Sequence, residues 1–279
     1  MNTGGPTNGL PDTDGHGRIR ADFARVFGAW DESWQQAIEL LPDFVEAHVQ
    51  LHEAAARTGS LTPEVRQLVH LALASAATHL HTPSVERHVR AALALGASPG
   101  EVLEVFALTS TLGIHACTTG IPLLLEVLTE NELRREPSTA DEQHAQLKAD
   151  FVASRGYWNE MWDGLLELAP DFFAAYTKFS SAPWQHGFLR PHVKELIYLA
   201  FDISATHLYE PGAKLHMRNA LKLGADVADA LEVMTIATLV GSSTCAVGLP
   251  ILAAASGHAS PTHAVPTRTV SPTPNDQQP

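Results

Sequence analysis

The residues Thr78–Ala97, THLHTPSVERHVRAALALGA, return 128 positions later as THLYEPGAKLHMRNALKLGA at Thr206–Ala225. The similarity extends outward from this stretch, and residues 22–122 align with residues 150–250 without a gap. The identical pairs include large and chemically distinctive residues: Phe23/Phe151, Trp30/Trp158, Trp34/Trp162, His88/His216, Cys117/Cys245 and Pro122/Pro250. Internal repetition of this length predicts two tandem copies of one structural unit.

Hydrophobic residues within each copy recur at helical spacing. Between Pro63 and Thr78 the apolar side chains stand three or four positions apart, and no window alternates as a strand does. Pro83 and Gly96 delimit a second helix, and Ser98 is placed to cap a third. Further helices are expected over residues 22–40, 44–57 and 122–128. The sequence therefore predicts an all-α fold.

The repeat also sets the expected boundaries along the chain. They are a disordered N-terminus over 1–20, a first unit over 21–128, a connector over 129–149, a second unit over 150–256 and a disordered tail over 257–279. The polar, Gly-rich start and the Pro/Ser/Thr-rich end carry too few apolar residues to fold. Because one unit alone leaves apolar helix faces uncovered, the two copies are expected to pack with near two-fold pseudosymmetry.

Composition excludes several classes of partner. With 279 residues, 45% of them hydrophobic, the chain can form real cores, whereas its net charge of −13 argues against nucleic acid, which requires a basic face. The polar start lacks the pattern of a signal peptide, and no run of about 18 uninterrupted apolar residues indicates a membrane span. A cytoplasmic location is expected. The two cysteines are far apart in sequence, so we expect two free thiols and no disulfide.

The quoted stretch and its repeat resemble the signature helix pair of the carboxymuconolactone decarboxylase and alkylhydroperoxidase D-like superfamily. The shared features are the helical His88 and His216, each with the Gly that follows it, and the resemblance covers nearly all of both units. It implies tandem alkylhydroperoxidase D-like helical units and a small-molecule substrate. It also implies a homo-oligomer, either a trimer of tandem chains or an arrangement like the hexamers of single-unit relatives.

One motif divides this superfamily by chemistry. Peroxidase members have a Cys-x-x-Cys whose second thiol resolves the sulfenic acid of the first, but the equivalent pairs here are His81/Ser84 and Tyr209/Gly212. The missing cysteine pair argues against alkylhydroperoxidase or peroxiredoxin-like antioxidant activity, which is kept only as an alternative. The resemblance to the decarboxylases implies instead a lyase that acts without a cofactor on a small carboxylated lactone or oxo-acid. A histidine would act as the general acid or base.

The candidate catalytic residues follow from the resemblance and from the repeat. They are His88, His216, Glu195, His115, Cys117 and Tyr209. Glu195 corresponds to an acidic residue that the family often has on the preceding helix, and it could orient a histidine. For His88 and His216 the alternative is a core histidine bonded to a helix carbonyl. For Cys117 the alternative is a small buried hydrophobic residue.

A divalent metal is the alternative to a cofactor-free site. Imidazoles are dense in the first copy, where His79, His81, His88 and His115 could ligate it. A capping role at the end of the preceding helix is favoured for His79 and His207. If His88, Cys117 and His115 share one pocket, the first copy is the better candidate for an active or metal site. A metal-binding or non-catalytic descendant of the family is the third hypothesis.

Overall fold

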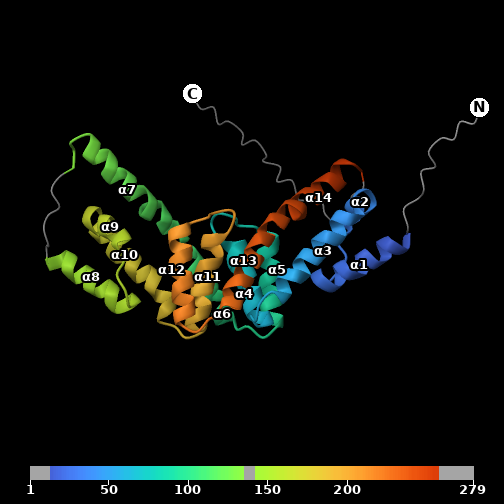
Figure 1. Cartoon of the computed structure of the whole chain (residues 1–279), viewed down its shortest axis with the longest axis horizontal. Helices are drawn as coiled ribbons and strands as arrows, with labels where there is room; N and C mark the ends of the chain where they lie inside the picture. The colour runs from blue at the N-terminus through green and yellow to red at the C-terminus, as the bar shows by residue number, and fades with distance from the viewer. Residues whose placement is uncertain (1–12, 135–141, 258–279) are drawn as a thin grey trace, which may run out of the picture. The chain divides into compact units, whose positions relative to one another are not determined.

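The structure is a computed structural model that describes residues 13–134 and 142–257, and within these ranges every regular element is a helix (Figure 1). The all-α prediction is confirmed. The described chain forms two compact units, the first built from residues up to Glu53 together with those from Ser242 onward, and the second from Ala54–Gly241. The predicted connector contains the end of α7 and the start of α8, and its residues 135–141 lie outside the described ranges.

Unit 1 combines the start of the chain with its last helix. Its elements are α1 (Thr13–Phe27), η1 (Glu32–Trp34), α2 (Gln35–Leu40), most of α3 (Pro42–Arg57) and α14 (Ser243–Ala255). The N-terminal prediction needs two corrections. The chain is helical from Thr13, inside the segment expected to be disordered, and the single helix expected over 22–40 is broken. Gly28, at φ 91°, ends α1, and the Asp31 side chain caps η1.

His48 lies in the core of unit 1, where its ring is 4.6 Å from that of Trp34, centroid to centroid. Burial lowers the pKa of His48 from its ordinary value of 6.5. The unfolded chain therefore binds this proton more tightly than the folded one does. The contribution of His48 to the free energy of unfolding is therefore fully present above pH 6.5, and it is lost as the pH falls toward the lowered pKa.

We expect His48→Phe to flatten the decline in melting temperature between pH 7 and pH 5, because phenylalanine keeps the apolar contacts but takes up no proton. Thermal unfolding followed by circular dichroism at a series of pH values measures this slope. His186→Phe, at an exposed position, is the control and should leave the slope unchanged. An unaltered slope in His48→Phe would show that other groups cause the acid sensitivity.

Unit 2 holds the remaining helices. In chain order they are α4 (Pro63–Ser75), α5 (Thr82–Ala94), α6 (Pro99–Thr109), η2 (Ser110–Ile114), α7 (His115–Glu130), α8 (Glu142–Arg155), η3 (Glu160–Trp162), α9 (Asp163–Leu168), α10 (Pro170–Ser181), η4 (Ala182–Trp184), α11 (Pro191–Ile203), α12 (Glu210–Lys222), α13 (Val227–Thr238) and η5 (Leu239–Ser242). At its centre α4–α6 of the first copy pack against α11–α13 of the second. Helix α11 is buried from Val193 to Asp202, and it therefore provides a rigid base for side chains at its end.

Two buried ion pairs join the copies inside unit 2. Lys194 on α11 lies 2.9 Å from Glu104 on α6, and Arg66 on α4 lies 2.5 Å from Glu232 on α13. The two pairs occupy equivalent positions in the repeat, so that each copy gives a cation to one pair and an acid to the other. Such reciprocal contacts are those of an isologous interface. They support the two-fold relation between the copies, which stays a prediction.

Helix α7 belongs to the first copy by sequence but packs on helices of the second (Figure 1). Ile114, Cys117 and Ile121 contact the cluster of Phe151, Trp162, Leu165 and Phe173 from α8–α10. In unit 1, Cys245 and Leu249 of α14 pack likewise on residues of α1–α3. The last helix of each copy is thus exchanged, so the compact units do not coincide with the two sequence repeats.

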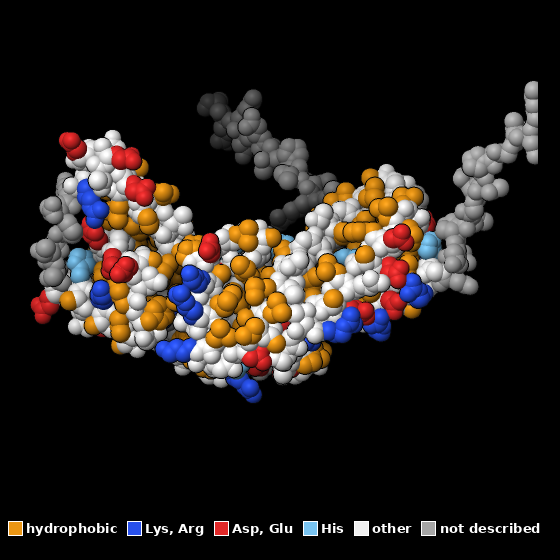
Figure 2. All heavy atoms as spheres, viewed as in Figure 1, with side chains coloured by type: hydrophobic (Ala, Val, Ile, Leu, Met, Phe, Trp, Pro, Cys, Tyr) orange, Lys and Arg blue, Asp and Glu red, His pale blue; other side chains and the backbone are white. Residues whose placement is uncertain are grey.

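Apolar side chains remain exposed on these exchanged helices, and Figure 2 shows hydrophobic atoms at the surface over α7. Leu123, Val127 and Ile251 are each more than half exposed. The continuous helical stretches Pro99–Glu130 and Val227–Ala255 are long and apolar enough to cross a membrane by length and composition alone. Exposed apolar surface of this kind also suits the predicted homo-oligomer.

Candidate active site

A pocket in unit 2 lies where the start of α7 meets α8, α10, α11 and α12, and it is partly open to solvent. Its polar lining consists of Thr111, His115, Thr118, Arg155, Tyr157, Tyr176, Ser180, Tyr198, Tyr209 and His216. Apolar walls are formed by residues such as Phe151, Met161, Trp162 and Phe201. A concave, largely apolar pocket with a few convergent polar groups is the usual form of a small-molecule site.

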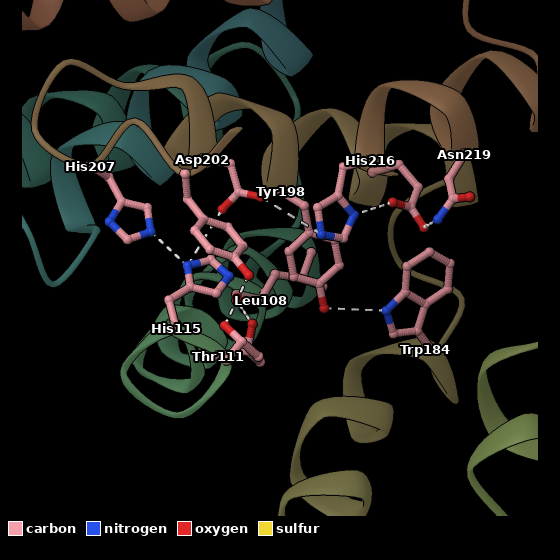
Figure 3. A network of polar contacts seen from close by, with 12 residues as sticks. Leu108, Thr111, His115, Trp184, Tyr198, Asp202, His207, His216 and Asn219 are labelled. Carbon is pink, nitrogen blue, oxygen red and sulfur yellow. Dashed lines mark hydrogen bonds and ion pairs between the residues drawn. The ribbon is translucent and has the colours of Figure 1, made fainter. Parts of the chain in front are cut away.

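His216 is held rigidly at one wall of this pocket (Figure 3). Its Nδ1 lies 2.6 Å from Oε2 of the buried Glu195, and the other carboxylate oxygen accepts a hydrogen bond of 3.3 Å from Asn219. The ring of Tyr198 stacks on the imidazole at 4.5 Å between centroids. Because Glu195 accepts from Nδ1, the Nε2 atom is left to exchange a proton with a ligand.

Arg155 brings a positive charge to the same pocket. Its guanidinium donates to the carbonyl of Ser180 at 3.0 Å and lies 5.2 Å from the ring centroid of Trp184. None of the ion pairs between described residues involves Arg155. Burial raises the pKa of the neighbouring Tyr157, whose hydroxyl therefore stays protonated and able to donate. A partly buried guanidinium without an acidic partner is suited to bind an anionic ligand.

A cluster of three polar side chains, His115, His207 and Asp202, lies beside His216. His115 Nδ1 is 2.6 Å from His207 Nε2 and 3.8 Å from Oδ1 of Asp202, while Oδ2 of Asp202 is 3.9 Å from His216 Nε2. Asp202 therefore lies between the imidazole pair and His216, as Figure 3 shows. Burial, and then the charge of Glu195, raises the pKa of Asp202 to about 8. Burial, followed by His207 and His216, lowers the pKa of His115 to about 3.

Local backbone geometry makes this cluster possible. Helix α11 ends at Ile203, and Leu208 adopts the left-handed conformation with φ 51°, which is rare for a leucine. The turn lets the Tyr209 amide donate to the Asp202 carbonyl at 2.7 Å, so the chain folds back over the carboxylate. A Cβ at Gly212 would lie 2.1 Å from Oδ2 of Asp202, so any larger residue would force the carboxylate to move from this position.

The structure brings together four of the predicted residues: His216, Glu195, His115 and Tyr209. The Tyr209 ring stacks on His115 at 3.9 Å, and its hydroxyl donates to Thr118. Cys117 instead packs in the apolar cluster below α7 and does not line the pocket. Both cysteines are free, as the sequence predicts.

The expected grouping around His88 needs correction. Its Nδ1 lies 2.8 Å from Gln67 and its ring stacks on His70, and neither His88 nor Cys117 shares the pocket of His115. The first copy was favoured on the condition that His88, Cys117 and His115 share one pocket, and they do not. Helix α7 packs on helices of the second copy, so His115 lies in the second copy's pocket instead.

The predicted metal set also does not converge. His81 bonds to Ser84, and α4 ends at Ser75, so His79 lies in the turn beyond the helix rather than at its end. Among the described residues, the one cluster of histidine, cysteine and acidic side chains close enough to hold a metal ion is His115, Asp202 and His207.

Sequence reasoning missed Asp202, Arg155, Tyr157 and Tyr198, and it assigned only a capping role to His207. The missed signal is a difference between the copies. The first copy has Ala74, Phe27, Ala29 and His70 at the four equivalent positions. A search for polar residues that only one copy contains would have found the second copy's pocket.

Comparison with known proteins agrees with this architecture. The model of the "Carboxymuconolactone decarboxylase family" matches twice, at residues 42–116 and 170–254. The chain is similar to a crystal structure from Burkholderia xenovorans LB400, provisionally assigned as a gamma-carboxymuconolactone decarboxylase subunit, with 43% identity and a TM-score of 0.82. The similarity covers 89% of this chain and 98% of that one. No curated protein matches the sequence.

Proposed function

Because this chain belongs to the carboxymuconolactone decarboxylase family, we propose that it removes carbon dioxide from a small carboxylated lactone in the pocket around His216. The observation that carries the proposal is the His216–Glu195 hydrogen bond of 2.6 Å at the wall of a pocket that also contains Arg155. A proton donor and an anion-binding group thus face one small cavity. A cofactor-free decarboxylation requires both.

The proposed step breaks the bond between the leaving carboxylate and the ring. Carbon dioxide departs, and the electron pair that remains delocalises through the adjoining double bond toward the lactone carbonyl. The Nε2–H of protonated His216 then gives its proton to the remote carbon. Glu195 orients the ring and stabilises its positive charge, as the acid of a catalytic triad does. Arg155 and the Tyr157 hydroxyl bind an anionic oxygen of the substrate and stabilise developing negative charge.

Antioxidant activity remains the alternative, but no observation in the pocket favours it. Cysteine does not line the pocket, and burial raises the pKa of the Cys245 thiol in unit 1. Peroxide reduction by a cysteine requires an accessible thiolate, which a raised pKa disfavours.

Carbon dioxide release from carboxymuconolactone by the purified protein tests the proposal directly. We expect Arg155→Gln to lower kcat/KM by about 10- to 100-fold, because Arg155 both binds the anionic oxygen and stabilises the developing charge, and a charge-assisted hydrogen bond contributes about 1.5–3 kcal/mol. Arg218→Gln, at an exposed position on α12, is the matched control and should behave as wild type. Absence of carbon dioxide release from wild-type protein that has full helicity would contradict the proposed function.

A further inference from the structure

We propose that His115, His207 and Asp202 bind one divalent transition-metal ion, with Zn²⁺ as the reference case. His115 begins α7, Asp202 lies at the end of α11, and His207 lies in the turn that follows α11. One ligand atom from each lies within 4.8 Å of the other two. The proposed decarboxylation assigns its roles to His216, Glu195 and Arg155, so none of the three metal ligands is one of those groups, and the nearest approach is Asp202 Oδ2 at 3.9 Å from His216 Nε2.

The donor set suits such an ion. Two imidazole nitrogens and one carboxylate oxygen are common ligands of Zn²⁺, at about 2.0–2.2 Å from the metal. His115 Nδ1 and His207 Nε2 are 2.6 Å apart and face each other, which without a metal requires a shared proton. Replacing this proton by a metal ion needs the rings to separate slightly and Asp202 to approach from 3.8 Å. Three protein ligands leave at least one coordination position for water.

Asp202 supplies the independent observation. Its side chain is fully buried at 0% exposure, and neither carboxylate oxygen has a hydrogen-bond partner among the described residues. A buried carboxylate without hydrogen bonds is costly to ionise unless a cation compensates its charge. Both imidazole nitrogens near it are beyond hydrogen-bond distance, at 3.8 and 3.9 Å. A metal ion held with His115 and His207 would satisfy this carboxylate.

The residues that form the proposed metal site have no equivalent set in the other half of the repeat. The positions equivalent to Asp202 and Gly212 are Ala74 and Ser84, so the carboxylate and the glycine that gives it room occur together in one copy only. His79 matches His207, but Ser243 replaces His115. The Tyr209 ring, stacked on His115 at 3.9 Å, holds one ligand in place. Groups that orient ligands in this way usually support metal affinity.

Calorimetric titration with ZnCl₂, after removal of metal with chelator, measures the site in the full chain. We expect one equivalent of Zn²⁺ per chain, with affinity weakened at least about ten-fold in Asp202→Asn and in His207→Gln. His79→Gln is the matched control in the first copy and should bind as wild type does. Unchanged binding in Asp202→Asn, or no saturable binding by wild-type protein, would overturn the proposal.

Crystals of the wild-type protein soaked in ZnCl₂ provide a test that does not depend on the folding of a variant. We expect an anomalous difference peak about 2.0–2.2 Å from His115 Nδ1 and His207 Nε2. Peaks confined to other histidines would show adventitious binding and overturn the assignment. Neither experiment measures decarboxylation, so a failure of the proposed function leaves this test intact.

Discussion

Replacing His216 with alanine is expected to lower kcat for carbon dioxide release by about 10²- to 10⁴-fold, the usual contribution of a positioned general acid. The effect should be large because, in the proposed mechanism, His216 provides the proton from the wall of the pocket. Its Nδ1 is already bonded to Glu195 at 2.6 Å, which fixes the orientation of the ring. Steady-state assays with carboxymuconolactone measure the loss, and circular dichroism verifies that the variant is folded.

The repeat supplies matched controls for this experiment. His88→Ala removes the equivalent imidazole of the first copy, which bonds to Gln67 outside the pocket, and should leave kcat within about two-fold of wild type. Glu195→Gln reproduces the first copy's residue and should lower kcat less than His216→Ala does, because glutamine still accepts a hydrogen bond. Equal losses from His88→Ala and His216→Ala would refute the assignment of catalysis to the second copy.

Replacing Lys194 with methionine is expected to reduce the free energy of unfolding by about 3–5 kcal/mol. The substitution leaves Glu104 as a buried carboxylate at 4% exposure, without the ammonium group 2.9 Å away. Among the described residues, Glu104 retains only the amide of Leu189 as a hydrogen-bond donor. The methionine cannot replace the bonds that Lys194 donates to two backbone carbonyls. Chemical denaturation monitored by circular dichroism measures the difference.

A double variant separates the lost ion pair from lost packing. Lys194→Met combined with Glu104→Leu removes both charges, and we expect it to recover a large part of the stability. Arg66→Met tests the equivalent pair with Glu232 and should be destabilising in the same direction. A loss below about 1 kcal/mol in Lys194→Met would mean that the pair behaves as if it were at the surface.

The sequence predicts much of the fold because the helices depend on local signals. Pro83, Gly96 and Ser98 act within one turn of the helices they delimit, and the structure has a complete capping box at Ser98. The break at Gly28 was missed because a lone glycine does not reveal its φ angle. The exchange of α7 and α14 was also missed. Periodicity shows which helix face is apolar, but it does not show which copy will cover that face.

The candidate site was predictable only in part for the same reason. His216 and Glu195 followed from the family resemblance and lie together because α11 and α12 are neighbours in sequence. His115 was assigned to the first copy because no feature of the local sequence shows that its helix packs on the other copy. Asp202 stands in the apolar run of α11, and Arg155 ends a polar helix, so neither was distinctive. The contrast with Ala74 and Phe27 becomes informative once the copies are compared position by position.

A crystal structure with the decarboxylated lactone bound would test most directly the central claim that the pocket around His216 is the active site. We expect electron density in the pocket of unit 2, with an anionic oxygen at the Arg155 guanidinium and the lactone ring within reach of His216 Nε2. Density beside His88 in the first copy, with none in the pocket that contains Arg155 and His216, would contradict it.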